Sequence, residues 1–250
     1  MSSAPAATAR TPSRVTVPTR QRRKQARPQE LLDAALALFA EKGFAAAKSE
    51  QVAARAGVSK GTLYLYYPSK QELFKAVVRQ NLSSLIAEGT EKAACFEGST
   101  GELLLQLLVT WWQRVGSTSA ASIHKIVLSE VHNFPELASF YNDEVLRPAA
   151  ALFSGAVRRG VARGEFRAVN EHEAAHALMA PVLFMSLCQQ SFGSLNVCGE
   201  NLEPQALLRT NLDLLLRGLQ VRLPEHALQP AAAAVTAPAV PDKPVRHPRR

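Results

Sequence analysis

The stretch SEQVAARAGVSKGTLYLYYPSKQELF, Ser49 to Phe74, holds the most informative pattern in the chain. Its residue types predict two helices of about two turns each, joined by the tight turn AGVS, in which Gly57 permits the sharp bend. Ser59 is a good N-cap for the second helix, which would run to about Tyr67. This arrangement is the helix-turn-helix, in which the second helix enters the major groove of DNA.

The second helix is unusual for a core helix because its expected outer side is polar and aromatic. That side would present groups that bond phosphates or base edges, namely Lys60, Thr62, Tyr64 and Tyr66. Gly61 permits close approach of the backbone, and Leu63 and Tyr67 would face inward. The alternative is that the tyrosines are ordinary half-buried aromatics and that the lysines of this region are solvated charges.

The order of segments around this motif is similar to that of one known family. An apolar helix is followed by EKGF (41–44), by VAARAGVSKGTLYLYYPSK (52–70) and by a new helix with ELF (72–74). This order resembles the TetR/AcrR family of one-component transcriptional regulators. The resemblance implies an all-α fold, with an N-terminal three-helix helix-turn-helix DNA-binding domain at 25–85 and a C-terminal helical ligand-binding and dimerisation domain at 86–222.

The resemblance also implies which residues touch DNA, most of them in the motif at about 48–67. The family usually has Thr at the positions of Ala47 and Lys48, so the first helix of the motif is capped by Ser49 or weakly capped. Leu65 stands where Trp or Tyr is frequent, so a base contact there would be apolar, for example with a thymine methyl. Phosphate contacts are expected from Lys48, Ser49, Tyr64, Tyr66 and Lys70, and contacts at or near bases from Lys60, Gly61, Thr62 and Leu65. Ser59, at the start of the second helix, is a further DNA-binding candidate.

Positive charge is concentrated near the N-terminus. Residues 1–86 hold 14 Lys and Arg against 5 Asp and Glu, whereas the whole chain of 250 residues has a formal net charge of +8. A basic third on a near-neutral remainder favours a polyanion partner, with nucleic acid first and an anionic membrane surface second. The segment RQRRKQAR (20–27) would either follow DNA or serve solubility.

The apolar runs are shorter than the about 20 residues that a membrane span needs, so no membrane partner is expected. Three widely spaced cysteines fit a reduced, cytoplasmic setting. Residues 1–24 and 223–250 are rich in Ala and Pro and predict disordered tails.

The first helix is expected to start at Pro28 and to stop at Gly43. Further helices are expected at about 49–56, 59–67, 70–90, 100–115, 119–132, 135–163, 171–193 and 204–220.

The C-terminal part carries weaker signals. LSEVHNFPELASFYNDEV (128–145) and VARGEF (161–166) look like the C-terminal domain of AefR-like members of the family. Leucines cover several faces of the helix after Pro204, as expected if the last two helices pack against their copies in a homodimer; burial within a monomer is the alternative. Residues that would line a pocket for a small apolar or aromatic effector, or else belong to the core, are Trp111, Trp112, His124, Phe140, Tyr141, Met179 and Met185.

The stretch NEHEAAH (170–176) contains the H-E-x-x-H pattern of helical zinc sites. A zinc site needs a third protein ligand, which the spacing after this pattern does not supply. Asn170 and Glu173 instead fit an N-cap with a capping box, in which Glu173 bonds back to the backbone N–H of the cap. We therefore expect no catalytic residue, no metal ligand and no cofactor, with His172 at the surface and His176 in the core or at an interface.

The expected function is that of a sequence-specific DNA-binding regulator that is not an enzyme. More specifically, we expect a homodimeric repressor that a small-molecule effector releases from a palindromic, double-stranded operator. Two alternatives stay open. One is a zinc metallohydrolase that uses HEAAH (172–176), and the other is a DNA-binding scaffold that responds to no ligand. A regulatory metal site on the two histidines is a further alternative.

Overall fold

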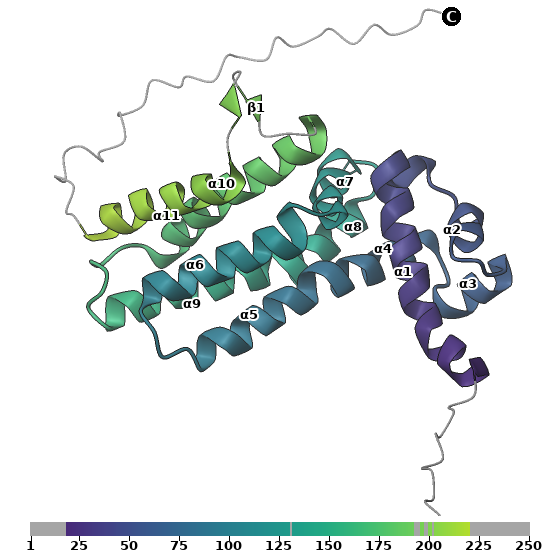
Figure 1. The fold of residues 1–250 in the computed structure, drawn as a ribbon, viewed down its shortest axis with the longest axis horizontal. Helices are drawn as coiled ribbons and strands as arrows, with labels where there is room; N and C mark the ends of the chain where they lie inside the picture. The colour runs from purple at the N-terminus through teal and green to yellow at the C-terminus, as the bar shows by residue number, and fades with distance from the viewer. Residues whose placement is uncertain (1–18, 131, 193–195, 198–199, 202, 221–250) are drawn as a thin grey trace, which may run out of the picture.

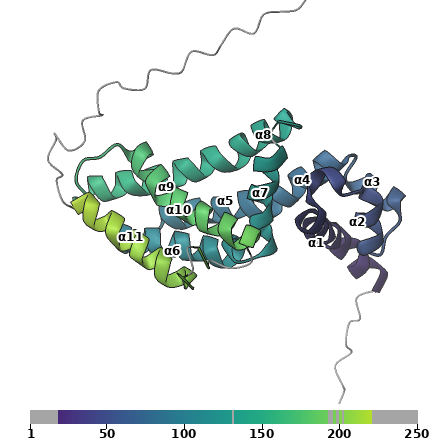
Figure 2. The ribbon, with the colours of Figure 1, turned by 90° about the horizontal axis from the view of Figure 1, so that it is seen from above.

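The computed structural model describes residues 19–130, 132–192, 196–197, 200–201 and 203–220. The fold is all-α, as predicted, apart from a short antiparallel pair of strands, β1 (Asn196–Val197) and β2 (Glu200–Asn201). The molecule is elongated, with a small domain of α1–α4 at one end and a larger bundle of helices at the other (Figures 1 and 2).

The helices lie close to their predicted positions. They are α1 (Thr19–Ala46), α2 (Ser49–Arg55), α3 (Lys60–Tyr66), α4 (Lys70–Val78), α5 (Ser84–Ala94), α6 (Thr100–Trp111), α7 (Ser122–Glu130), α8 (Pro135–Tyr141), α9 (Arg147–Ala162), α10 (Glu171–Phe192) and α11 (Pro204–Gln220). Wide π-type turns, η1 (Arg79–Ser83), η2 (Trp112–Gly116) and η4 (Asn142–Leu146), and a 3₁₀ turn, η3 (Ser119–Ala121), continue or precede them. Through η1 and η4, α4–α5 and α8–α9 form two long continuous rods.

The first helix differs from the prediction at its start. It begins at Thr19, so Pro28 lies inside the helix and not in its first turn. Good helix formers precede this proline, and they extend the helix although proline removes one backbone hydrogen bond. Residues 19–24 are therefore helical, while residues 1–18 and 223–250 of the predicted tails lie outside the described residues. At the other end, Gly43 leaves the helical conformation with φ of +76°, as its residue type predicts.

The N-terminal domain is built around an aromatic core. Phe39 and Phe44 of α1 and Phe74 of α4 are at most 1% exposed, and their ring centroids lie 5.3–5.7 Å apart in tilted or edge-on pairs. Leu63 of α3 is fully buried in the same cluster, as its position predicts. Burying a side chain of this size contributes roughly 1.5–3 kcal/mol. The core therefore fixes α2 and α3 on α1 and α4.

The C-terminal domain has a second apolar core between α6, α9, α10 and α11. Its most extensive helix contact joins α9 and α10, and α11 lies along α6 and α10 at one edge (Figure 1). None of the helices in the described part of the chain combines the length and hydropathy that a bilayer crossing requires.

The domains meet at several places, among them the α4–α5 rod and the contact of α7 with α1. The α4–α5 rod runs out of the N-terminal domain into the bundle (Figure 1). The helix α7 packs on α1, and at its end Glu130 accepts a hydrogen bond from the Ala45 N–H at 3.2 Å. The Phe134 ring lies edge-on to Phe44 at 5.1 Å. The end of α1 is thus held by residues of the C-terminal domain.

Candidate nucleic-acid interface and ligand cavity

The turn between α2 and α3 has the predicted geometry. Gly57 has φ of +65°, which side chains with a Cβ rarely adopt. Ser59 caps α3, since its Oγ accepts the Thr62 N–H at 3.1 Å and lies 2.9 Å from the Thr62 Oγ1. The helix α3 therefore begins at a fixed point, at the end of the molecule away from the bundle (Figures 1 and 2).

The outer face of α3 presents a cation, an aromatic ring and a leucine. The Leu65 side chain is 81% exposed and Tyr64 is 39% exposed. The Lys60 Nζ lies 2.5 Å from Glu50 Oε1 on α2 and 5.7 Å from the centre of the Tyr64 ring. The hydrogen bond between Lys60 and Glu50 raises the pKa of the lysine and lowers the pKa of the carboxyl. Gly61 is exposed beside them and leaves room for a close approach.

Lys70 has a structural role that its sequence position did not predict. Its Nζ donates hydrogen bonds to the carbonyl oxygens of Phe44, Ala45 and Ala47 at 2.8, 3.1 and 3.1 Å. Partial burial lowers the pKa of the Lys70 ammonium. An ammonium has three N–H donors, so all of them are used by carbonyl oxygens at the end of α1 and directly after it. A phosphate contact by Lys70 stays a prediction.

Ser49 at the start of α2 and Tyr66 at the end of α3 are less exposed than the prediction assumed, whereas Lys48 is exposed. Lys48 is the N-cap of α2, and its side chain cannot accept a hydrogen bond. Of the two predicted alternatives, a cap from Ser49 or a weak cap, the structure therefore has the weak cap. The Gln51 Oε1 accepts the Lys48 N–H at 3.3 Å. Ser49 is 6% exposed, and Tyr66 is half-buried against the aromatic core. Their contacts with DNA stay predictions, and the side chains of 20–27 lie outside the described residues.

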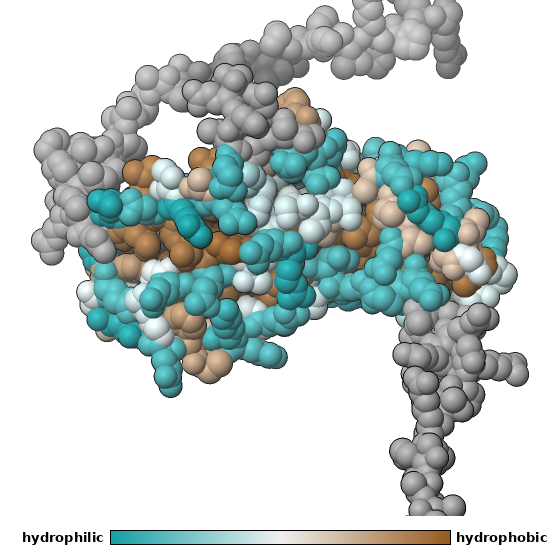
Figure 3. All heavy atoms as spheres, in the orientation of Figure 1, coloured by the Kyte–Doolittle hydropathy of each residue, from teal (hydrophilic) through white to brown (hydrophobic). Residues whose placement is uncertain are grey.

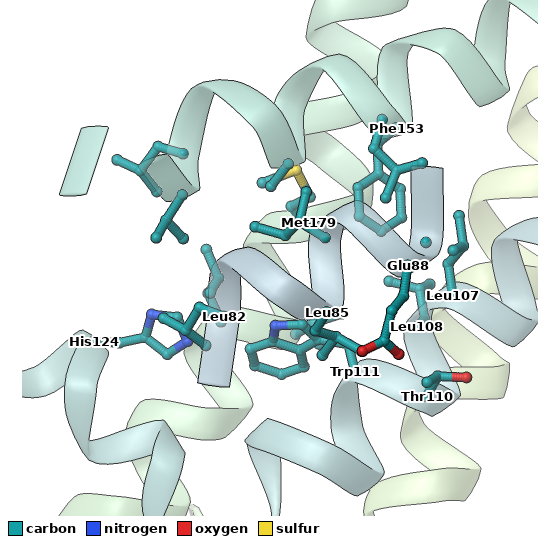
Figure 4. Close-up of a pocket in the computed structure, with 18 of the residues that line it drawn as sticks. Leu82, Leu85, Glu88, Leu107, Leu108, Thr110, Trp111, His124, Phe153 and Met179 are labelled. Atoms are coloured by element: carbon teal, nitrogen blue, oxygen red, sulfur yellow. The ribbon is translucent and has the colours of Figure 1, made fainter. Parts of the chain in front are cut away.

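A cavity of about 290 Å³ lies in the C-terminal domain, lined by α5, α6, α7, α8, α9, α10 and the turns beside them. Its walls are mainly aliphatic, with Leu82, Leu85, Leu107, Phe153 and Met179 among the lining residues (Figure 4). The charged side chains in the lining are Glu88 and Lys92, both exposed on α5, and they mark the end that faces solvent.

Some predicted pocket residues line this cavity and others do not. Those that do are Trp111, His124, Tyr141 and Met179. Trp112 and Met185, 4% and 3% exposed, belong to the core of the bundle instead, and Phe140 packs beside the N-terminal core. Consecutive residues of a helix point about 100° apart, which separates Trp111 from Trp112 and Tyr141 from Phe140. Sequence spacing alone did not show which of each pair faces the cavity.

His124 and Tyr141 form a buried pair in the cavity wall. The Tyr141 hydroxyl is hydrogen-bonded to the His124 Nδ1, and the two residues are 6% and 7% exposed. Burial lowers the pKa of His124 to about 4 and raises the pKa of Tyr141 above its usual value. Both side chains are therefore neutral at pH 7. The Trp111 ring lies 5.7 Å from the His124 ring, centre to centre.

The segment NEHEAAH forms the N-terminus of α10. The Asn170 Oδ1 accepts the N–H groups of His172 and Glu173 at 3.0 and 3.3 Å, as expected of an N-cap. Glu173 binds the side-chain amide of Asn170 at 3.0 Å and not its backbone N–H, which corrects the predicted capping box. His176 is exposed, with Nδ1 2.7 Å from the His172 carbonyl oxygen, so it does not lie in the core, and its place at an interface stays a prediction.

Within the described residues, three or more His, Cys, Asp or Glu side chains nowhere come together in a group that could hold a metal ion.

Two family models match the chain. One is described as "Bacterial regulatory proteins, tetR family" and covers residues 31–77, and the other as "Tetracyclin repressor-like, C-terminal domain" and covers residues 97–191. The chain belongs to the TetR family of transcriptional regulators. The two matches correspond to the helix-turn-helix domain and to most of the bundle that encloses the cavity.

Similar TetR-family proteins come from several bacteria. The transcriptional repressor KstR2 of Rhodococcus jostii is 29% identical over 167 residues, which are 66% of this chain and 79% of KstR2. The fatty acid metabolism regulator protein of Bacillus subtilis is 23% identical over 200 residues, 78% of this chain and 98% of that protein. A crystal structure of FadR from Bacillus subtilis with stearoyl-CoA has a TM-score of 0.61 at 18% identity over 77% of this chain and 99% of that one. This structure supports the fold.

Sequence reasoning missed most of the cavity wall and two contacts of this TetR-family regulator. The wall includes Leu82, Leu85 and Leu107, whose residue type is common in any helical core. Glu50 and Glu130 were missed because their partners, Lys60 and Ala45, lie on other elements. The sequence shows the carboxylates themselves, but it does not show which group on another element each one contacts.

Proposed function

We propose that this TetR-family regulator is a homodimeric repressor that binds a palindromic operator through α3 and leaves it when a small molecule occupies the cavity. The observation that carries the proposal is the outer face of α3. A capped helix held by an aromatic core presents Lys60, Tyr64 and Leu65 outward. A leucine that is 81% exposed leaves apolar surface in water, and burial against a partner would remove it.

The residue types on α3 support reading of base pairs as well as grip on the backbone. A leucine side chain fits the methyl group of thymine, and a lysine donates to guanine O6 and N7. Tyr64 donates a hydroxyl suited to a phosphate. Lys60 is paired with Glu50, so DNA has to replace this ion pair, which favours partners that supply a strong acceptor at that point.

Exposed apolar side chains on the last two helices support a dimer. Phe184 of α10 and Leu214 of α11 are 60% and 65% exposed. Figure 3 shows apolar surface between polar rows on the half of the molecule formed by the bundle, where α11 lies. A two-fold pair of such faces would form a four-helix interface. It would set the distance between two copies of α3 near the spacing of adjacent major grooves, roughly 34 Å.

Two elements connect the cavity to the DNA-binding domain. The α4–α5 rod contributes Leu82 and Leu85 to the cavity wall, and its other end, α4, packs on α1. The helix α7 begins beside the cavity with His124 and ends with Glu130 on the Ala45 N–H. A ligand that fits one position of these helices better than another would change the distance between the two α3 helices.

An apolar effector is supported by the walls of the cavity. FadR of Bacillus subtilis, a structural relative, was solved with stearoyl-CoA, a ligand with a long apolar chain. We propose no enzymatic role, because Glu173 is held by Asn170 and the His176 Nδ1 is held by the His172 carbonyl oxygen. A ligand-independent DNA-binding scaffold is less well supported, since its bundle would need no cavity.

The test begins with selection of bound sequences from a random DNA pool. We expect a palindrome with half-sites about one helical turn apart, bound by a dimer, and measured by fluorescence anisotropy and light scattering. Leu65→Ala with Tyr64→Ala should abolish specific binding without loss of helicity. Tight operator binding by a monomer, or recovery of no sequence from the pool, would contradict the proposal.

A further inference from the structure

The cavity contains one polar atom that its surroundings leave without a partner. His124 lines the cavity and is 7% exposed, and its Nδ1 is paired with the Tyr141 hydroxyl. The second ring nitrogen, Nε2, is buried and makes no hydrogen bond with any group among the described residues. A buried polar group without a partner is costly, and in a native protein a missing hydrogen-bonding partner is one explanation for it.

The hydrogen-bond network assigns the proton on this nitrogen. The Tyr141 hydroxyl is buried, and its hydrogen bond in the structure is with the His124 Nδ1. The hydroxyl has one proton to donate, and Nδ1 is the acceptor that this hydrogen bond offers it. The hydroxyl therefore donates and Nδ1 accepts. A neutral imidazole that accepts at Nδ1 carries its hydrogen on Nε2. The free position is therefore an N–H donor, and its complement is an oxygen acceptor.

The rest of the cavity limits the remainder of the ligand. Beside His124 the walls are apolar and include Leu82 and Trp111 (Figure 4). Figure 4 shows His124 at the opposite end of the cavity from Glu88. Burial of a charge beside a neutral donor, away from any counter-charge, is strongly unfavourable. The end beside His124 therefore suits a polar but uncharged oxygen.

The volume sets the size. An apolar protein cavity of about 150 Å³ is known to hold benzene, which has six heavy atoms. The volume here is about 290 Å³, close to twice that value. A ligand of roughly ten to twelve heavy atoms would fill it.

We propose that the effector is a mainly apolar molecule of roughly ten to twelve heavy atoms, whose buried end carries one uncharged oxygen, a carbonyl or a hydroxyl, held by the His124 Nε2–H. This inference rests on the proposed function for the word effector, but the ligand chemistry follows from the cavity itself. A bare alkyl tail offers the donor no acceptor, and a carboxylate at this end would accept the hydrogen bond but would bury a charge without a counter-charge.

The proposal is tested with four ten-carbon probes and the full chain in the absence of DNA. The probes are 2-decanone, 1-decanol, n-decane and decanoate, and binding is measured by calorimetry and by tryptophan fluorescence, to which Trp111 in the cavity wall contributes. We expect the ketone and the alcohol to bind about tenfold more tightly than the alkane, the value of one hydrogen bond. Decanoate should bind more weakly than the ketone.

Variants at His124 separate recognition from folding. His124→Leu should reduce the affinity for 2-decanone about tenfold and leave that for n-decane unchanged, so that the preference disappears. His124→Gln retains a hydrogen-bond donor and should restore much of the preference for 2-decanone over n-decane. Glu88→Gln, at the other end of the cavity, is the matched control and should keep the full preference. Operator binding by each variant shows that it is folded.

Several outcomes overturn the proposal. They are equal binding of ketone and alkane, tightest binding of decanoate, a preference that survives in His124→Leu, and binding of none of the probes up to their solubility. The proposed function is tested separately, by adding the probes to the operator complex. If the ketone binds through His124 but leaves the complex intact, release by this ligand fails while the ligand chemistry stands. If another compound releases DNA without any dependence on His124, the ligand chemistry fails while the repressor function stands.

Discussion

At the scale of single residues, Lys70 ties the start of α4 to the end of α1 within the DNA-binding domain. Its ammonium binds the carbonyl oxygens of Phe44, Ala45 and Ala47. We expect Lys70→Met to lower the free energy of unfolding by about 1–3 kcal/mol, because three carbonyls lose a charged donor. Lys75, whose Nζ pairs with the partly exposed Glu72 at 2.9 Å, is the control. Lys75→Met should cost less than about 1 kcal/mol. Urea unfolding measures both.

Operator binding distinguishes this role of Lys70 from a phosphate contact. A lost phosphate contact reduces the slope of log affinity against log salt by about 0.9. If Lys70→Met changes this slope while the free energy of unfolding stays the same, the lysine grips DNA and does not hold the loop.

The buried imidazole of His124 makes a prediction about pH. Burial lowers its pKa from 6.5 to about 4, so between these values the unfolded chain binds a proton that the folded chain excludes. Above pH 6.5 the imidazole is neutral in both states and costs no stability. As the pH falls below 6.5, protonation of the unfolded chain lowers the free energy of unfolding, by about 3 kcal/mol at pH 4. Urea unfolding from pH 7 to pH 4 should therefore show a steeper loss for the natural chain than for His124→Gln. Parallel curves for the two proteins would contradict it.

At the scale of elements, α9 contains two glycines with opposite expected behaviour. A Cβ on Gly160 would overlap the ring of the buried Phe166, whereas a Cβ on Gly155 would meet nothing within 4 Å. We expect Gly160→Ala to lower the free energy of unfolding by about 1–3 kcal/mol through overpacking. Gly155→Ala should raise it by up to about 1 kcal/mol, since alanine favours a helix. Thermal unfolding compares the pair, and equal effects would show that the α9 contact with Phe166 is wrong.

The recognition helix α3 and its neighbour α2 share an ion pair that DNA has to break. We expect Glu50→Gln to strengthen operator binding several-fold at low salt, because it frees Lys60 and removes a negative charge near the phosphates. Thr62→Ala and Lys60→Ala should instead change sequence preference, by about 1–3 kcal/mol for each lost base contact. Anisotropy titrations with the selected operator and with single-base variants would show it. Unchanged preference in both alanine variants would remove α3 from base recognition.

At the scale of the whole molecule, the apolar faces of α10 and α11 predict a dimer. Leu214→Asp and Phe184→Asp should each shift the protein toward a monomer and weaken operator binding at least tenfold, because two half-sites are no longer bound together. Leu128 of α7 is 63% exposed and lies outside these two helices, so Leu128→Asp is the control. Light scattering at micromolar concentration, followed by operator titration, tests the prediction. A dimer that survives both substitutions would place the interface elsewhere.

The sequence by itself determined the fold class, the positions of the helices and the helix-turn-helix. These features depend on neighbours in the chain, such as Ser59 capping α3 three residues before Thr62, or Gly57 taking a positive φ. It also placed Trp111, His124, Tyr141 and Met179 among the pocket candidates, because aromatic and Met residues at helical spacing are few in this chain.

Tertiary structure alone decided which side of each helix faces the cavity and which charges meet across elements. A shift of one residue turns a helical side chain by about 100°, so Trp111 lines the cavity while Trp112 enters the core. Lys70 met three carbonyls 23 to 26 residues away, and His124 met Tyr141 across 17. Such partners are brought together by the packing of the helices, and local sequence patterns do not show which residues far apart in the chain will meet.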